Sequence, residues 1–203
     1  MDHFSAKNII DLYQQHSEHW DAIRRDLLYE ASWLERFRAL LPAGADILDI
    51  GCGSGKPIAD YLLNKGHNLT GVDSSPAMIT LCCQRFPQQQ WHVADMRTLS
   101  LHQHFDGLIA WDSFFHLTRD DQRSMFPIFG AHARENAVLM FTSGPGNGEA
   151  IGEFQGEPLY HASLAPEEYR TLLADNGFKV IKMIAEDPEC TGHTVWLAQR
   201  GMG

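Results

Sequence analysis

The chain has 203 residues, of which 44% are hydrophobic and 21% charged, as expected for one folded domain with a substantial core and not for a disordered chain. Its formal net charge is −10 and no cluster of Lys and Arg stands out, so nucleic acid and anionic membranes are not expected partners. No apolar run has the length of a bilayer span, residues 1–11 lack the order of a signal peptide, and Cys52, Cys82, Cys83 and Cys190 match no disulfide or metal framework, so a cytoplasmic protein with free thiols is expected.

The pattern of apolar residues predicts helices alternating with short strands. Residues 5–40 carry apolar side chains at helical spacing, and we expect residues 1–42 to form a helical cap at the N-terminus. In chain order the sequence then predicts a strand at 47–50, a helix at 57–65, a strand at 68–72, a helix at 76–86, strands at 91–93 and 106–111, a helix at 118–133, a strand at 137–142, a helix from 166 that Gly177 closes, and strands at 178–185 and 193–199. Pro127 is expected to kink or break the helix that contains it.

This alternation favours a single α/β domain, residues 1–203, with a mostly parallel sheet and helices on both faces. Residues 143–165 interrupt the pattern. Their first part, 143–156, is rich in glycine and too long for an ordinary connection, so we interpret 143–165 as a functional loop or lid on the substrate side.

The clearest functional motif is residues 49–55, which read Asp-Ile-Gly-Cys-Gly-Ser-Gly. The motif lies directly after a predicted strand and before a predicted helix, where small residues let the backbone approach a ligand and the helix start offers unpaired N–H groups. Ligands bind at this edge of open α/β sheets. The glycines are spaced G-x-G-x-G, not the G-x-G-x-x-G of dinucleotide-binding proteins.

Two further acidic positions favour nucleoside binding. Asp73 ends the next predicted strand, where a carboxylate can accept both hydrogen bonds of a ribose diol. Asp95 and Met96 follow the third predicted strand, where a carboxylate can accept from an exocyclic amine and a methionine can lie against an adenine face. Asp95 could equally be an ordinary turn or helix-capping residue.

Together these residues resemble the class I S-adenosylmethionine (SAM)-dependent methyltransferases, of the small-molecule, methyltransferase-domain-25-like type. The similarity runs from about Tyr13 to Arg200; the similar segments are 47–55, 71–78, 94–96, 105–117, 139–144, 166–178 and 194–200. The resemblance implies a Rossmann-like, doubly wound, seven-stranded sheet whose last strand is antiparallel. It also implies S-adenosyl-L-methionine as cofactor and S-adenosyl-L-homocysteine (SAH) as product.

The resemblance also assigns cofactor-binding roles by position. The methionine end of SAM falls to the loop residues Asp49, Gly51, Cys52, Gly53 and Gly55. The ribose falls to Asp73 and Ser74, and the adenine to Asp95 and Met96. Ala110, Trp111 and Asp112 would lie beside the methionine moiety and the reacting sulfur, and Tyr13, Trp20 and Arg24 on the first helical segment would close over SAM. That segment could alternatively be a plain amphipathic helix packed on the core.

The implied reaction is direct in-line displacement at the sulfonium methyl group, which needs a general base only when the acceptor is a neutral hydroxyl or amine. His116 is the first candidate base, with His161 and Glu149 behind it, although His116 could instead be a histidine packed among aromatics. Glu149 and Glu153 could equally hold a cationic acceptor. A metal site is not expected, because no local pair of metal-ligand spacing occurs.

Two alternative functions stay open: a nicotinamide-dependent oxidoreductase, which would need the missing G-x-G-x-x-G motif, and a SAM-binding module without catalysis. The expected partner is a small-molecule methyl acceptor, and the protein could be a monomer or a homodimer. The sequence leaves the accepting atom open among O, N, C and S.

Overall fold

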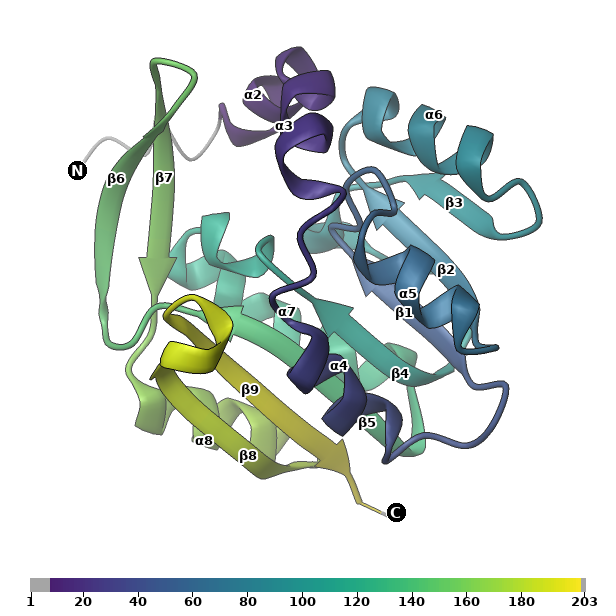
Figure 1. Cartoon of the computed structure of the whole chain (residues 1–203). Helices are drawn as coiled ribbons and strands as arrows, with labels where there is room; N and C mark the ends of the chain where they lie inside the picture. Colours follow the sequence, from purple (N-terminus) through teal and green to yellow (C-terminus); the bar gives the residue numbers. More distant parts are fainter. Residues whose placement is uncertain (1–7, 202–203) are drawn as a thin grey trace.

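The computed structural model describes residues 8–201, so the expectations for residues 1–7 lie outside the described part of the chain. The helices are α2 (Ile9–Gln15), α3 (Ser17–Arg24), α4 (Ala31–Arg38), α5 (Ile58–Asn64), α6 (Pro76–Arg85), α7 (Arg119–His132) and α8 (Pro166–Asp175). The strands are β1 (Asp46–Ile50), β2 (Asn68–Asp73), β3 (Gln90–Val93), β4 (Phe105–Ala110), β5 (Ala133–Ser143), β6 (Gly148–Phe154), β7 (Glu157–Ser163), β8 (Phe178–Asp187) and β9 (His193–Arg200). Figure 1 shows their arrangement.

Seven strands form the main sheet in the order β3-β2-β1-β4-β5-β9-β8. β1 pairs in parallel with β2 and β4, while β9, the last strand, runs antiparallel to both β5 and β8. The predicted fold is therefore confirmed, including the antiparallel last strand. The order reverses direction on either side of β1, and in open α/β sheets such a switch point is where ligands bind.

Helices cover both faces of the sheet. On one face α4 and α5 bury Trp33, Phe37 and Leu62 against the strands, and α6 packs beside them. On the other face, α7 and α8 bury a second cluster that includes Phe126 and Tyr169. Within residues 8–201, no helix is both long and apolar enough to cross a bilayer.

The N-terminal segment differs from the single helical stretch predicted over 5–40. It forms three short helices, with breaks at His16 and between Arg24 and Ala31. In the second break the Arg24 guanidinium donates to the backbone carbonyl of Leu27 and pairs with the Glu30 carboxylate. Both partners are in the break itself, so the side chain of Arg24 stabilises a non-helical path that apolar spacing does not reveal.

Residues 143–165, interpreted from the sequence as a functional loop or lid, contain regular secondary structure. Most of this segment is a two-stranded antiparallel hairpin, β6–β7, which stands apart from the main sheet. Glycines at Gly148 and Gly152 lie within its first strand, where they obscured the strand pattern. The expected break at Pro127 is also absent, since α7 continues through it. The start of α7 is capped by Thr118, whose hydroxyl accepts from the backbone N–H of Asp121.

Candidate functional site

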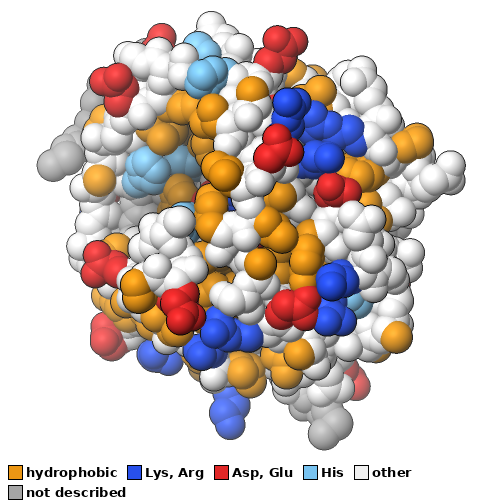
Figure 2. Space-filling view, in the orientation of Figure 1, with side chains coloured by type: hydrophobic (Ala, Val, Ile, Leu, Met, Phe, Trp, Pro, Cys, Tyr) orange, Lys and Arg blue, Asp and Glu red, His pale blue; other side chains and the backbone are white. Residues whose placement is uncertain are grey.

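A cavity of about 320 Å³ opens at the carboxyl ends of the strands on both sides of β1, beneath α2 and α3. Its wall combines the loops after β1, β2, β3 and β4 with side chains from the two N-terminal helices. Its volume lies at the lower end of the range typical of small-molecule sites. Figure 2 shows histidine side chains near this region, over the hairpin and the N-terminal helices, next to hydrophobic surface.

The glycine loop forms the floor of this cavity. Gly51 and Gly53 have φ angles of +76° and +53°, a region that residues with a Cβ rarely adopt. The N–H groups of Gly51 and Cys52 both donate to the Val72 carbonyl, at 2.8 and 3.0 Å, which ties the loop to the end of β2. A Cβ on Gly51 would lie 2.3 Å from the Cβ of Ser113, whereas one on Gly53 would meet nothing nearer than 3.8 Å. Gly51 therefore provides close packing, and Gly53 leaves room on the cavity side.

Asp73 is fixed by the backbone on both sides of its carboxylate. Oδ2 accepts from Gly53 N–H and Oδ1 from Ser75 N–H, each at 2.9 Å. Burial raises the pKa of Asp73, and these backbone hydrogen bonds only partly offset that effect. The same carboxylate thus joins the glycine loop to the end of β2, in the position predicted for a ribose-binding acid.

Asp49 is a second buried acid on the cavity wall, 2% exposed. Burial, followed by the repulsion of Asp73 and Glu30, raises the pKa of Asp49 to about 7. A carboxyl group in this state ionises readily when a cation arrives beside it.

Asp95 both lines the cavity and caps a short turn. Its side chain accepts from the backbone N–H of Arg97 and forms an ion pair with the Arg97 guanidinium at 2.6 Å, which lowers the pKa of Asp95. The capping role considered from the sequence is therefore present, and it coexists with a place on the wall beside Met96.

The three predicted cap residues reach the cavity from two helices, Tyr13 from α2 and Trp20 and Arg24 from α3. The Tyr13 and Trp20 rings meet edge to face, with centroids 5.3 Å apart. The tip of the β6–β7 hairpin closes over them, since Phe154 lies 6.0 Å from the Tyr13 ring and 5.7 Å from the Trp20 ring. The cavity thus has a two-part aromatic cover, made by α2–α3 and the hairpin.

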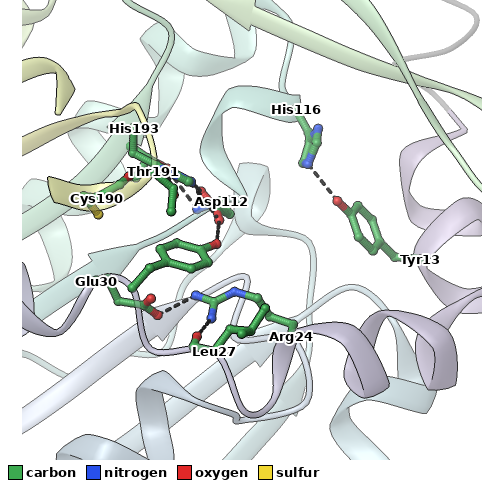
Figure 3. A network of polar contacts seen from close by, with 11 residues as sticks. Tyr13, Arg24, Leu27, Glu30, Asp112, His116, Cys190, Thr191 and His193 are labelled. Carbon is green, nitrogen blue, oxygen red and sulfur yellow. Dashed lines mark hydrogen bonds and ion pairs between the residues drawn. The ribbon is translucent and has the colours of Figure 1, made fainter. Parts of the chain in front are cut away.

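Asp112 is the centre of a polar network at the far end of the cavity (Figure 3). Its Oδ1 lies 3.0 Å from Nε2 of His193, and its Oδ2 accepts from the Tyr29 hydroxyl at 3.0 Å. Burial raises the pKa of Asp112, but the bonds to His193 and Tyr29 outweigh it and the net pKa is lowered. His193 has a raised pKa through the same pair, and its ring stacks on Trp111 with centroids 5.6 Å apart.

His116 lies in the turn that follows β4, is only 6% exposed and lines the cavity. Its Nε2 lies 3.0 Å from the Tyr13 hydroxyl and its Nδ1 lies 2.8 Å from the backbone carbonyl of Tyr160. Burial lowers the pKa of His116 to about 4. The ring also lies among aromatics, as the alternative reading anticipated, with the centroid of Phe115 at 4.8 Å.

Most residues predicted for the site are brought together by the fold. Those that line the cavity are Tyr13, Trp20, Arg24, Asp49, Gly51, Cys52, Gly53, Asp73, Ser74, Asp95, Met96, Trp111, Asp112 and His116. Their binding and catalytic roles remain predictions.

Five predicted residues do not line the cavity, among them Glu153, which is exposed on β6. Gly55 packs against Phe86 and Cys82, and Ala110 is fully buried within β4. His161 lies behind His116, with ring centroids 4.8 Å apart, and Glu149 pairs with Arg119 at 3.5 Å.

Sequence reasoning missed two polar residues of the Asp112 network, Tyr29 and His193. Tyr29 lies in the break between α3 and α4, which was predicted as helix. His193 is the first residue of β9, the last strand. Because β9 is antiparallel, it begins at the edge of the sheet where the parallel strands end, and Thr194 accordingly pairs with Ser143 at the end of β5. That topology could have placed His193 near the site.

Comparisons with known proteins agree with this geometry. A family model described as a methyltransferase domain matches residues 47–135. An O-methyltransferase of Pyrenophora dematioidea is 26% identical over 172 residues, covering 78% of this chain and 64% of the relative. The O-methyltransferase resE of Aspergillus sclerotiorum is 27% identical over 152 residues, covering 69% and 57%. The chain thus spans less than two thirds of the length of these relatives.

Solved structures share the fold at low sequence identity. The 1,6-didemethyltoxoflavin-N1-methyltransferase of Burkholderia thailandensis, solved with its substrate and SAH, has a TM-score of 0.77 at 19% identity and covers all of this chain and 91% of its own. A SAM-dependent methyltransferase of Clostridium acetobutylicum has a TM-score of 0.72 at 18% identity, covering 94% and 100%. Residues 47–135 therefore match a methyltransferase-domain family, and the chain as a whole has the fold of class I SAM-dependent methyltransferases.

Proposed function

We propose that this protein binds SAM in the cavity above β1 and transfers its methyl group to a small-molecule acceptor by direct in-line displacement. The observation that carries the proposal is the Asp73 carboxylate, held by Gly53 N–H and Ser75 N–H at the point where the glycine loop meets the end of β2. With both oxygens anchored, the remaining lone pairs of the carboxylate are available to a ribose diol without any rearrangement of the protein.

The donor set of the cavity fits SAM. The open side of Gly53 leaves space where a side chain would otherwise fill the floor. Met96 and Met78 offer polarisable apolar surface on the wall, as an adenine ring requires. Asp49 and Asp112 add acidic side chains to the cavity wall, which suits a ligand that carries a sulfonium and an ammonium group. Arg24 and Lys56, which pair with Glu30 and Asp60, also line the cavity and are the cations that we expect nearest to its carboxylate.

SAM supplies the methyl group on a sulfur that is a good leaving group, so the protein needs no covalent intermediate. Its residues hold the two reactants in line, which can supply about 7–11 kcal/mol of the barrier when the geometry is close to ideal. The aromatic cover of Tyr13, Trp20 and Phe154 excludes water from the reacting centre. His116 lines the cavity and is the candidate base, with its Nε2 3.0 Å from the Tyr13 hydroxyl.

Calorimetric titration with SAH, SAM and NADH tests the cofactor. We expect saturable binding of SAH and SAM at one site per chain and no binding of NADH. Asp73→Asn should weaken SAH binding by tenfold or more, because its amide would present a donor where Asp73 presents an acceptor. Asp175→Asn, at the exposed end of α8, is the matched control and should bind as the parent does. Binding of NADH in place of SAM would refute the proposal.

Catalysis is tested by SAH formation from SAM in the presence of hydroxyl, amine and carboxylate compounds. Acceptor-dependent SAH formation that Asp73→Asn reduces would support the enzymatic function. Tight SAM binding without any acceptor-dependent SAH formation would instead favour a binding module.

A further inference from the structure

Three groups near the aromatic cover form one continuous hydrogen-bonded chain. The Tyr13 hydroxyl lies 3.0 Å from Nε2 of His116, and Nδ1 of His116 lies 2.8 Å from the backbone carbonyl of Tyr160 (Figure 3 shows the first contact). Tyr13 comes from α2, His116 from the turn after β4, and Tyr160 from β7. The helical cap, the sheet and the hairpin therefore each contribute one member.

The Tyr160 backbone carbonyl determines which atom donates in each of these two hydrogen bonds. A carbonyl oxygen only accepts hydrogen bonds, so Nδ1 of His116 must carry the hydrogen. The ring is neutral, because burial lowers the pKa of His116 to about 4 and the hydrogen bond to the Tyr160 carbonyl only partly offsets that effect. A neutral imidazole with a hydrogen on Nδ1 has a lone pair on Nε2. The Tyr13 hydroxyl must therefore donate to His116.

This direction determines what the Tyr13 oxygen can offer to a third partner. Its one hydrogen points to His116, so only its lone pairs remain, and Tyr13 lines the cavity. Contacts with Trp20 and Phe154 hold the ring in place. Burial and the charges of Asp112 and Asp73 raise the pKa of Tyr13, so the hydroxyl does not persist as a phenolate. The wall thus presents a fixed hydrogen-bond acceptor backed by a proton acceptor.

We propose that the methyl acceptor is a hydroxyl compound whose O–H donates to the Tyr13 oxygen and whose proton leaves through Tyr13 to His116. This inference rests on the proposed methyltransferase function and adds the class of acceptor and a catalytic role for Tyr13. As the acceptor oxygen forms its bond to the methyl carbon, the carbon–sulfur bond breaks and its electron pair stays on sulfur. The acceptor proton moves to the Tyr13 oxygen while the Tyr13 proton moves to Nε2 of His116. The products are a methyl ether, SAH and a protonated His116, which returns its proton to water.

The chemistry of the relay favours an acidic hydroxyl, such as a phenol or an enol, over an aliphatic alcohol. His116 is a weak base in this environment, so it can receive a proton only from a group that has become acidic in the transition state. A phenol, with a pKa of about 10, is far more acidic before the reaction than an aliphatic alcohol, so it loses its proton to a weak base more easily.

The donor and acceptor roles of Tyr13 and His116 can be tested without any methyl acceptor. Nitrogen-15 NMR of the SAH complex should show His116 as the neutral tautomer with its hydrogen on Nδ1 between pH 6 and pH 8. Tyr13→Phe should shift the Nε2 resonance, because Nε2 loses its donor. Tyr61→Phe, at a tyrosine that does not line the cavity and donates to Glu35, should not. A hydrogen on Nε2 in the parent protein would overturn the proposal even if SAH binds as expected, which separates its failure from that of the proposed function.

A matched set of acceptors tests the chemistry: 2-naphthol, 2-naphthalenemethanol and isoquinoline, whose nitrogen carries no proton. We expect 2-naphthol to be methylated fastest, and at saturating SAM we expect Tyr13→Phe to lower kcat/KM for 2-naphthol at least tenfold more than it lowers any isoquinoline methylation. Binding of 2-naphthol and of its methyl ether to the SAH complex is measured in parallel, and the naphthol should bind more tightly only when Tyr13 is present. Equal binding of the two, or an equal effect of Tyr13→Phe on naphthol and isoquinoline methylation, would refute the relay.

Discussion

Replacing Gly51 by alanine should damage the site more than any other single added methyl group in the glycine loop. Gly51 has a φ of +76°, and a Cβ there would lie 2.3 Å from the Cβ and 2.7 Å from the Oγ of Ser113. Ser113 cannot simply move away, because its hydroxyl donates to the Ile50 carbonyl at 2.8 Å. The matched control is Gly53→Ala, which has a similar φ of +53° but no neighbour within 3.8 Å.

The magnitude follows from two separate costs. An alanine in the left-handed region costs about 1–2 kcal/mol, and both variants carry this cost. Carbon atoms in contact are normally about 3.5–4.0 Å apart. The 2.3 Å approach in Gly51→Ala therefore forces a local shift, and overpacking of this kind costs about 1–3 kcal/mol. We expect a loss of unfolding free energy of about 2–5 kcal/mol for Gly51→Ala and about 1–2 kcal/mol for Gly53→Ala.

Urea denaturation of the two variants, and of Gly51→Ala combined with Ser113→Gly, measures these terms. Measured against Ser113→Gly alone, which also lacks the hydrogen bond to Ile50, the double variant should show only the backbone cost of the alanine, because the clash is absent. In calorimetry, both single variants should bind SAH more weakly than the parent, since both glycines line the cavity. Equal stabilities of Gly51→Ala and Gly53→Ala would show that the contact with Ser113 is not tight and would refute the reasoning.

Three further outcomes are expected. SAM affinity should fall as the pH drops below 7, by up to tenfold per pH unit, because the SAM cation binds ionised Asp49, whose pKa is about 7. Calorimetry at several pH values should show that this pH dependence vanishes in Asp49→Asn. A pH dependence that persists in the variant would mean that another group titrates. The pKa of His193 is raised by its pair with Asp112, so this pair stabilises the fold fully below the unfolded pKa of about 6.5 and loses its contribution as the pH rises through the folded pKa. In denaturant melts, the difference in unfolding free energy between the parent and His193→Asn should therefore shrink from pH 6 to pH 8. A difference that widens over this range would contradict the pairing. Phe154→Ala should speed amide hydrogen exchange in α2 and α3 and weaken SAH binding, because each lost aromatic contact is worth about 0.5–1.5 kcal/mol. The control Ile151→Ala, at a residue of the same hairpin that is 59% exposed, should leave exchange and binding unchanged. Equal exchange in the two variants would argue against the aromatic cover.

Local features of the sequence were sufficient for most strands of the sheet and for the centre of the candidate site, whereas the antiparallel last strand was implied by the family resemblance. Buried strands and amphipathic helices have their own apolar spacing, and a glycine run between a strand and a helix can only form a tight turn at the carboxyl edge of the sheet. The end of β2 follows from the same alternation, so Asp73 could be placed beside that turn before any contact was known. The resemblance to class I methyltransferases was confirmed by the family match over residues 47–135.

Features that depend on distant contacts or on side-chain chemistry required the tertiary structure. The β6–β7 hairpin was hidden by glycines within its strand, and the break after α3 depends on bonds that Arg24 makes, which apolar spacing does not register. The contact between Tyr13 and His116 joins residues 103 positions apart, and that between His193 and Asp112 joins residues 81 apart. A sequence specifies which side chains prefer burial, but the partner of a buried polar group is decided only when the chain brings separate elements to the same edge of the sheet.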